Sequence, residues 1–230
     1  MKNSVEHIFF DLDHTLWDFE KNSSESLREC YRHFNLAEKS RGQSEDVFIE
    51  TYLGHNDRLW GLYRQNKITK SRLRKARFER TLQSLRIQDK DLPLKMDALY
   101  MSICPRKKEL LPGTLDILHH VKDNYHLHIL SNGFHETQLI KMNNSGLDKF
   151  FLQIITSERA GAKKPDPRIF RFAESITGAT TQNSLMIGDN LDVDVKGAVD
   201  YGWKAIHFNP GKIDHSFEEV GELLELKKLL

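Results

Sequence analysis

Two carboxylates, Asp11 and Asp13, close an apolar run near the start of the chain and stand one residue apart. The apolar residues 8–10 predict a buried strand, whose end would deliver both acids to one edge of a parallel sheet. A carboxylate can attack a phosphate ester and form an acyl phosphate when a divalent cation and a cation-lined pocket neutralise the incoming charge. The second acid can then carry the proton of the leaving group. An isolated Asp-x-Asp is more often a cap beside a solvated acid, so this interpretation depends on the rest of the chain.

Three later segments place further polar groups directly after apolar runs. The turn Ser131-Asn132-Gly133 offers a hydroxyl and backbone N–H groups that can hold a phosphate, although such residues often form a turn and nothing more. Residues 163–167, Lys-Lys-Pro-Asp-Pro, restrict the backbone so that a lysine can point to a site, or else form a solvated basic loop. Residues 185–194 repeat the opening pattern of an apolar strand followed by carboxylates, of which Asp189 could instead cap a helix.

The elements that must position these groups alternate between strand and helix. Strands are predicted over 126–130, 153–156, 184–187 and 204–208, with helices between them. This alternation is typical of an α/β fold with a Rossmann-like parallel sheet, in which ligands bind at the carboxyl ends of the strands. The first strand most simply joins the same sheet, which would bring all four polar segments to one edge.

Between the first strand and the rest, the chain is rich in charge and carries apolar residues at helical spacing. We therefore expect two domains. Residues 1–16 and 106–230 form the Rossmann-like catalytic core, and residues 17–105 form an inserted helical cap.

Composition excludes several classes of function. The 34 basic and 33 acidic residues of the 230-residue chain nearly cancel, so nothing indicates a nucleic acid or a membrane as partner. Cys30 and Cys104 belong to no zinc-ligand pattern and suit a reduced cytoplasm. We see neither a signal peptide nor an apolar run long enough to cross a membrane, and expect a cytoplasmic protein. Oxygen-rich carboxylates without a matching His or Cys cluster favour Mg²⁺ as the cofactor.

The ordered set of 11–15 (Asp-Leu-Asp-His-Thr), 131–133 (Ser-Asn-Gly), Lys164-Pro165 and Gly188-Asp189 with Asp194 resembles the haloacid dehalogenase superfamily of aspartate-nucleophile phosphotransferases. The resemblance covers essentially the whole chain, and the helical insert is similar to the mobile cap of that superfamily. Dehalogenases lack the second acid of the first motif because displacing halide needs no leaving-group proton. Asp13 therefore points to a phosphatase.

The resemblance also implies a role for each motif residue. Asp11 would be the nucleophile and a magnesium ligand. Asp13 would give its backbone carbonyl to the metal and act as general acid and then general base. Asp189 would complete the metal ligands, and Asp194 would act behind them or orient the lysine. The phosphate-binding residues would be Thr15, Ser131, Asn132 and Lys164.

Within the superfamily, segments of the cap resemble bacterial 5′-nucleotidases that include pyrimidine nucleotidases, which implies a nucleoside 5′-monophosphate as the substrate. Trp17, Asn56, Trp60 and Arg77 are the candidates for substrate specificity, although packing is the commoner role of a tryptophan at helical spacing. The alternatives are a sugar-phosphate phosphatase, a phosphomutase or a non-catalytic binding module. The last is disfavoured because a pure binder has little need for adjacent repelling carboxylates. The sequence leaves the oligomeric state open.

Overall fold

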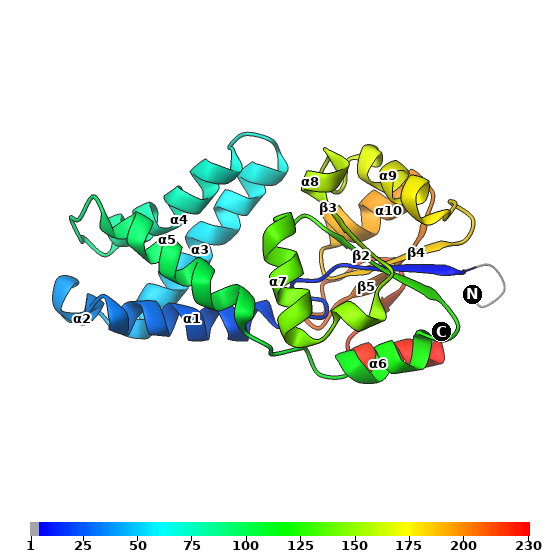
Figure 1. Ribbon diagram of the computed structural model, residues 1–230, viewed down its shortest axis with the longest axis horizontal. Coiled ribbons are helices and arrows are strands. Elements are labelled where there is room, and N and C mark those ends of the chain that lie inside the picture. The colour runs from blue at the N-terminus through cyan, green and yellow to red at the C-terminus, as the bar shows by residue number, and fades with distance from the viewer. Residues whose placement is uncertain (1–4) are drawn as a thin grey trace. The chain divides into compact units, whose positions relative to one another are not determined.

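The structure is a computed structural model that describes residues 5–230. It divides into two compact units (Figure 1). One unit, the core, consists of the chain up to Phe19 together with Lys108–Leu230, and the other, the cap, consists of Glu20–Lys107. The predicted cap, residues 17–105, begins three residues before this second unit begins and ends two residues before it ends.

The core contains one parallel sheet, as predicted, with the strand order β3-β2-β1-β4-β5-β6. The strands are β1 (His7–Phe10), β2 (His126–Ser131), β3 (Gln153–Thr156), β4 (Ser184–Gly188), β5 (Lys204–Phe208) and β6 (Glu219–Val220). The chain leaves β1 for the cap and returns to add β2 beside it, and then crosses to add β4 on the other side. This reversal of direction at β1 creates the switch point at which open α/β sheets bind their ligands.

Helices cover both faces of the sheet, with α6 and α7 on one side and α9 and α10 on the other (Figure 1). The helical elements of the core are α6 (Thr114–Val121), α7 (His135–Ser145), η2 (Asp148–Phe150), α8 (Ser157–Ala160), α9 (Pro167–Thr177), η3 (Leu191–Lys196), α10 (Gly197–Tyr201) and η4 (Leu223–Lys228). The central strands β1 and β4 are buried along their whole length, which explains why they consist mostly of apolar residues.

An aromatic cluster anchors the face under α9 and α10. The ring of Phe9 lies 4.4 Å from that of Trp203, which lies 5.2 Å from that of Phe170 on α9. All three side chains are buried. Because successive residues of a strand point to opposite faces, Phe9 packs here while its neighbours in β1 pack on the other side. The fully buried β1 thereby gives its carboxyl end a rigid base.

The cap is helical throughout its regular structure. Its elements are α1 (Phe19–His33), which begins at the end of the core, α2 (Leu36–Lys39), α3 (Glu45–Arg64), α4 (Lys70–Ser84), α5 (Leu92–Ile103) and η1 (Cys104–Arg106). Ser44 caps α3 and Thr69 caps α4, each by accepting a hydrogen bond from a backbone N–H group of the first turn. Within residues 5–230, no helix is both long enough and apolar enough to cross a membrane.

Candidate active site

Three neighbouring strands bring the predicted motifs to one edge of the sheet. Phe10, the last residue of β1, is in register with Ile187 of β4 and Ile129 of β2. The N–H of Asp11 continues this pairing by donating to the Ile187 carbonyl at 2.9 Å. Asp11 and Asp189 therefore leave adjacent strands side by side. This is the arrangement that the strand-then-acid pattern predicted.

Lys164 contacts both the candidate nucleophile, Asp11, and the backbone at the end of β2. Its Nζ lies 2.6 Å from Asp11 Oδ1, 2.7 Å from Asp194 Oδ1 and 2.5 Å from the Leu130 carbonyl oxygen. An ammonium has three protons, so these three acceptors satisfy it completely. The side chain is buried. The lysine is thus a built-in cation of the site and not part of a solvated loop.

The cluster contains more carboxylates than cationic groups. Asp11, Asp189 and Asp194 offer oxygens within 4.8 Å of one another, against the single ammonium of Lys164. Burial raises the pKa of Asp11 well above its ordinary range, and the charges of Asp194 and Asp189 add to this although Lys164 opposes it. Burial likewise raises the pKa of Asp189 to about 7, with the charge of Asp194 contributing. An all-oxygen donor set with excess negative charge fits a hard divalent cation such as Mg²⁺.

Asp194 has both oxygens engaged by protein. Oδ1 pairs with Lys164, and Oδ2 accepts from the N–H of Asn190 at 3.0 Å. This suits the predicted role behind the ligands. A Cβ added at Gly188 would lie 2.3 Å from Asp194 Oδ2, so only glycine allows this carboxylate to approach β4. Asn190 also caps η3 by accepting from Val193, which shows that capping and site chemistry share this turn.

Asp13 is held by two residues of α7 that were not predicted. Lys141 Nζ lies 2.5 Å from Asp13 Oδ1, and Gln138 Nε2 donates to Oδ2 at 2.9 Å. Burial raises the pKa of Asp13, but the Lys141 ammonium and these hydrogen bonds outweigh it, so the pKa lies below its ordinary value. The resting carboxyl is therefore ionised. The helical spacing of 138 and 141 on one face of α7 was the only signal in the sequence, and any amphipathic helix shows it.

Ser131 has a proton to donate. Its Oγ accepts from the N–H of Gly133 at 3.1 Å and from Gln138 Nε2 at 2.8 Å. A hydroxyl has two acceptor positions and one proton, so within residues 5–230 the accepted bonds occupy the oxygen and leave the O–H for a ligand. This geometry supports the predicted contact between Ser131 and a phosphoryl oxygen.

Two other phosphate-binding candidates have additional partners. The Asn132 amide donates to the Lys164 carbonyl at 3.0 Å and accepts from the Lys164 N–H at 2.8 Å. Thr15 Oγ1 accepts from the Asp189 N–H at 3.1 Å and donates to Asp189 Oδ1 at 3.2 Å. Both side chains thus position a neighbouring site residue, and their contacts with phosphate stay predictions.

The specificity candidates are divided between the units. Trp17 belongs to the core, where it is fully buried with Lys141 Nζ 4.3 Å from its ring centre. Trp60 belongs to the cap and packs edge to face on Tyr63 with ring centres 5.5 Å apart. Stacking of a nucleobase on either ring stays a prediction.

Asn56 and Arg77 are both buried inside the cap. Arg77 Nη2 donates to Asp97 at 2.7 Å, and its guanidinium lies 4.9 Å from the ring centre of Tyr100. Among the described residues, neither Asn56 Oδ1 nor Arg77 Nε has a hydrogen-bond partner. The ion pair with Asp97 and the contact with Tyr100 show that Arg77 packs within the cap. A role in substrate specificity stays a prediction for both Asn56 and Arg77.

The chain is similar in sequence to known hydrolases. A family model described as haloacid dehalogenase-like hydrolase matches residues 5–202. The pyrimidine 5′-nucleotidase YjjG of Escherichia coli K12 is 28% identical, over 97% of this chain and 96% of its own length. The pyrimidine 5′-nucleotidase PynA of Streptococcus pneumoniae is also 28% identical, over 90% of this chain and 85% of its own length.

The fold is also found in a crystal structure. The putative HAD-hydrolase YfnB of Bacillus subtilis superimposes with a TM-score of 0.89 at 26% identity, with 99% of each chain covered. That structure is described as bound to magnesium and as revealing interdomain movement.

Proposed function

This chain belongs to the haloacid dehalogenase-like hydrolase family, and from that premise we propose that it is a magnesium-dependent phosphatase of nucleoside 5′-monophosphates. The observation that carries the proposal is the meeting of Asp11, Lys164 and Asp189 at the end of the central strands, with Lys164 Nζ 2.6 Å from Asp11 Oδ1. Similarity to two pyrimidine 5′-nucleotidases supports the choice of substrate.

In the first step a carboxylate oxygen of Asp11 attacks phosphorus. A new O–P bond forms, the bond from phosphorus to the ester oxygen breaks, and the phosphoryl group resides on Asp11. The Ser131 hydroxyl donates to a phosphoryl oxygen, and the ammonium of Lys164 beside Asp11 neutralises the charge of the incoming phosphoryl group. The residues that would hold Mg²⁺ are Asp11, Asp189 and the backbone carbonyl of Asp13. When bound, the cation supplies positive charge that reduces the repulsion between a carboxylate and a phosphate.

Asp13 carries the protons of both steps. As general acid it gives a proton to the departing alkoxide. As general base it then takes a proton from the water whose oxygen attacks phosphorus, which breaks the bond from phosphorus to Asp11 and frees the carboxylate. The overall reaction consumes one water and releases alcohol and inorganic phosphate. Because Lys141 keeps the resting carboxyl ionised, the acid role requires its pKa to rise when a dianionic phosphate binds nearby, as like charges dictate.

The core residues contact only phosphate and metal in this mechanism, so selectivity between esters must come from elsewhere. The cap candidates Asn56 and Trp60 offer an amide and an aromatic face, and Arg77 offers a guanidinium. A sugar-phosphate phosphatase or a phosphomutase would use the same core, and a binding module would use none of its chemistry.

A phosphate-release screen separates these possibilities. The full-length protein is assayed with pyrimidine and purine 5′-monophosphates and with sugar phosphates, in Mg²⁺ and in excess chelator. We expect the highest kcat/KM for a nucleotide and no turnover in chelator. A sugar phosphate as best substrate would contradict the nucleotidase assignment alone, whereas absence of phosphate release from every ester would reject the phosphatase.

Asp192→Asn is the matched control for the acids of the site. Asp192 is a neighbour of Asp189 in the chain, but its side chain is 78% exposed and pairs with Lys196 at 2.6 Å. We expect this variant to retain full activity while Asp11→Asn and Asp189→Asn lose it.

A further inference from the structure

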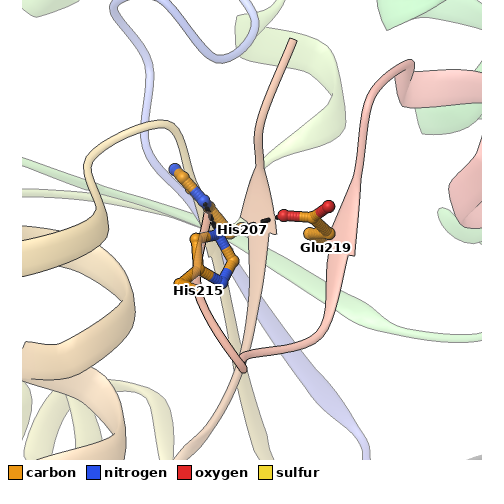
Figure 2. A group of neighbouring side chains, drawn as sticks. All are labelled: His207, His215 and Glu219. Atoms are coloured by element: carbon orange, nitrogen blue, oxygen red, sulfur yellow. Dashed lines mark hydrogen bonds and ion pairs between the residues drawn. The ribbon is translucent and has the colours of Figure 1, made fainter. Parts of the chain in front are cut away.

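A second cluster of titratable side chains lies at the end of β5 and has no part in the mechanism above. Figure 2 shows His207 on β5, His215 on the following loop and Glu219 at the start of β6. His207 Nδ1 lies 2.6 Å from His215 Nε2, which lies 3.0 Å from Glu219 Oε2. His207 is buried, whereas Glu219 reaches the surface.

Their partners determine which nitrogen of each ring carries the proton. The N–H of Phe217 donates to His215 Nδ1 at 3.1 Å, so neutral His215 holds its proton on Nε2. His207 Nε2 lies 2.8 Å from the backbone carbonyl oxygen of Asp189, which can only accept, so His207 holds its proton on Nε2 as well. The lone pair of His207 Nδ1 then faces the Nε2–H of His215. The hydrogen bonds form a directed chain from Phe217 to Asp189.

This geometry fits a chain of hydrogen bonds better than it fits a metal site. Two imidazoles and a carboxylate are ligand types for zinc, and their atoms lie within 4.8 Å of one another. However, a metal on His215 Nε2 would move the proton to Nδ1, against the N–H of Phe217. The 2.6 Å between the two ring nitrogens is also shorter than the roughly 3.3 Å that separates two nitrogen ligands of one tetrahedral zinc.

The chain of hydrogen bonds ends on a proposed magnesium ligand that is held at three points. Thr15 accepts from the Asp189 N–H and donates to Asp189 Oδ1. His207 donates to the Asp189 carbonyl from the opposite end of the same residue. At the outer end of the chain, Asn209 donates to Glu219 Oε2 at 2.7 Å and so restrains the carboxylate beside His215.

We propose that His207 is a positioning residue that orients Asp189 for the divalent cation, with His215 and Glu219 fixing the tautomer and the ring plane of His207. The proposal rests on Asp189 being a cation ligand, which is part of the proposed function. Groups that orient metal ligands change metal affinity by about 10- to 100-fold. Loss of the donor at position 207 should therefore change cation affinity more than it changes chemistry.

The test compares His207→Phe, which lacks a donor, with His207→Gln, whose amide can donate to the Asp189 carbonyl. Mg²⁺ is titrated against p-nitrophenyl phosphate turnover and, separately, against the thermal unfolding midpoint. We expect His207→Phe to need about 10-fold more Mg²⁺ for half-maximal activation and for half of the thermal shift. Turnover at saturating Mg²⁺ should change little, and His207→Gln should restore most of the affinity.

His128→Phe is the matched control, because His128 is also a buried histidine of a central strand but pairs with His7. It should lower thermal stability without changing the Mg²⁺ requirement. If His207→Phe fails to fold, His215→Gln on the loop is the second variant, with an expected loss of Mg²⁺ affinity of a few fold.

Wild-type Mg²⁺ affinity in His207→Phe or in His215→Gln would overturn the proposal, as would equal losses in the Phe and Gln variants at position 207. Binding of one equivalent of Zn²⁺ that His215→Gln abolishes would replace it with a metal site. If the wild type releases phosphate from no ester, the proposed function fails. The thermal titration would then still decide the role of His207.

Discussion

The two units each contain a buried cluster of charges, and the clusters are built to opposite balances. In the core, three carboxylates face the single ammonium of Lys164. In the cap, the single carboxylate of Asp97 faces two guanidinium groups, Arg77 at 2.7 Å and Arg74 at 2.8 Å. The core cluster therefore carries an excess of negative charge, and the cap cluster carries an excess of positive charge.

The pKa shifts record this difference. In the core, burial raises the pKa values of Asp11 and Asp189, so the fold resists their ionisation. In the cap, burial opposes the charge of Arg77, but its neighbours, among them Tyr52 and Asp97, hold its pKa above the ordinary range. A cluster that disfavours its own charges awaits a counter-ion or a substrate, whereas a cluster whose neighbours stabilise its charge packs a protein. Removing one charged residue at a time should therefore have different effects in the two clusters.

The largest effect is expected for Asp11→Asn. Loss of the nucleophile should reduce kcat by on the order of 10⁴-fold or more. Because burial disfavours the ionised form of Asp11, the substitution should leave the unfolding midpoint of the cation-free protein unchanged or raised. A variant with wild-type turnover would contradict the mechanism, and a large drop in the midpoint would contradict the charge comparison.

Asp13→Asn should slow phosphorylation most for esters with a poor leaving group. An alkoxide needs a proton to depart, whereas p-nitrophenolate does not, so the single-turnover phosphorylation rate should fall about 10²-fold or more for a nucleotide and much less for p-nitrophenyl phosphate. Rapid-quench measurement of both rates checks this. Equal losses for the two esters would remove the general-acid role from Asp13.

Cation binding should weaken as the pH falls through about 7. Burial, with the charge of Asp194, raises the pKa of Asp189 to about 7, and below that pH a proton competes with Mg²⁺ for the carboxylate. Mg²⁺ titrations of the thermal midpoint at several pH values measure this. The dependence should flatten in Asp189→Asn.

Without the cation, the same shift affects stability with the opposite sign. A folded-state pKa of about 7, above the ordinary value of 3.8, means that the contribution of protonated Asp189 is complete below about pH 4 and lost as the pH rises through 7. In chelator, the free energy of unfolding of the wild type relative to Asp189→Asn should therefore fall over this range. A difference that does not vary with pH would contradict the assignment.

Arg77→Met should destabilise the cap, in contrast to the effect of Asp11→Asn on the core. Removing one partner of a buried ion pair costs about 3 kcal/mol of unfolding free energy, at the lower end of the usual range because Arg74 still contacts Asp97. Chemical denaturation checks the loss. If the ratio of kcat/KM for nucleotide over sugar phosphate is unchanged, Arg77 only packs the cap. A changed ratio would make it a specificity residue.

The placement of the polar residues at one edge of the core sheet could be predicted from the sequence, because it depends on where strands end. A buried parallel strand is a continuous apolar run, and the residue after it must lie at the carboxyl edge of the sheet. This rule identified Asp11, Ser131 and Asp189 and predicted the fold that the structure and the family comparison confirm. The two prolines of 163–167 predicted that a lysine of this segment could point to the site, and the resemblance to the family selected Lys164.

Only the tertiary structure identified the residues that hold these groups in place. Lys141 and Gln138 are ordinary positions of an amphipathic helix until α7 packs beside Asp13. His207 lies inside a strand, where periodicity assigns it to the interior and says nothing of its partner. Its contact with the Asp189 carbonyl exists because β4 and β5 are paired with Gly188 opposite His207. Sequence patterns indicate where a strand ends, whereas the partner of a side chain depends on elements that only folding brings together.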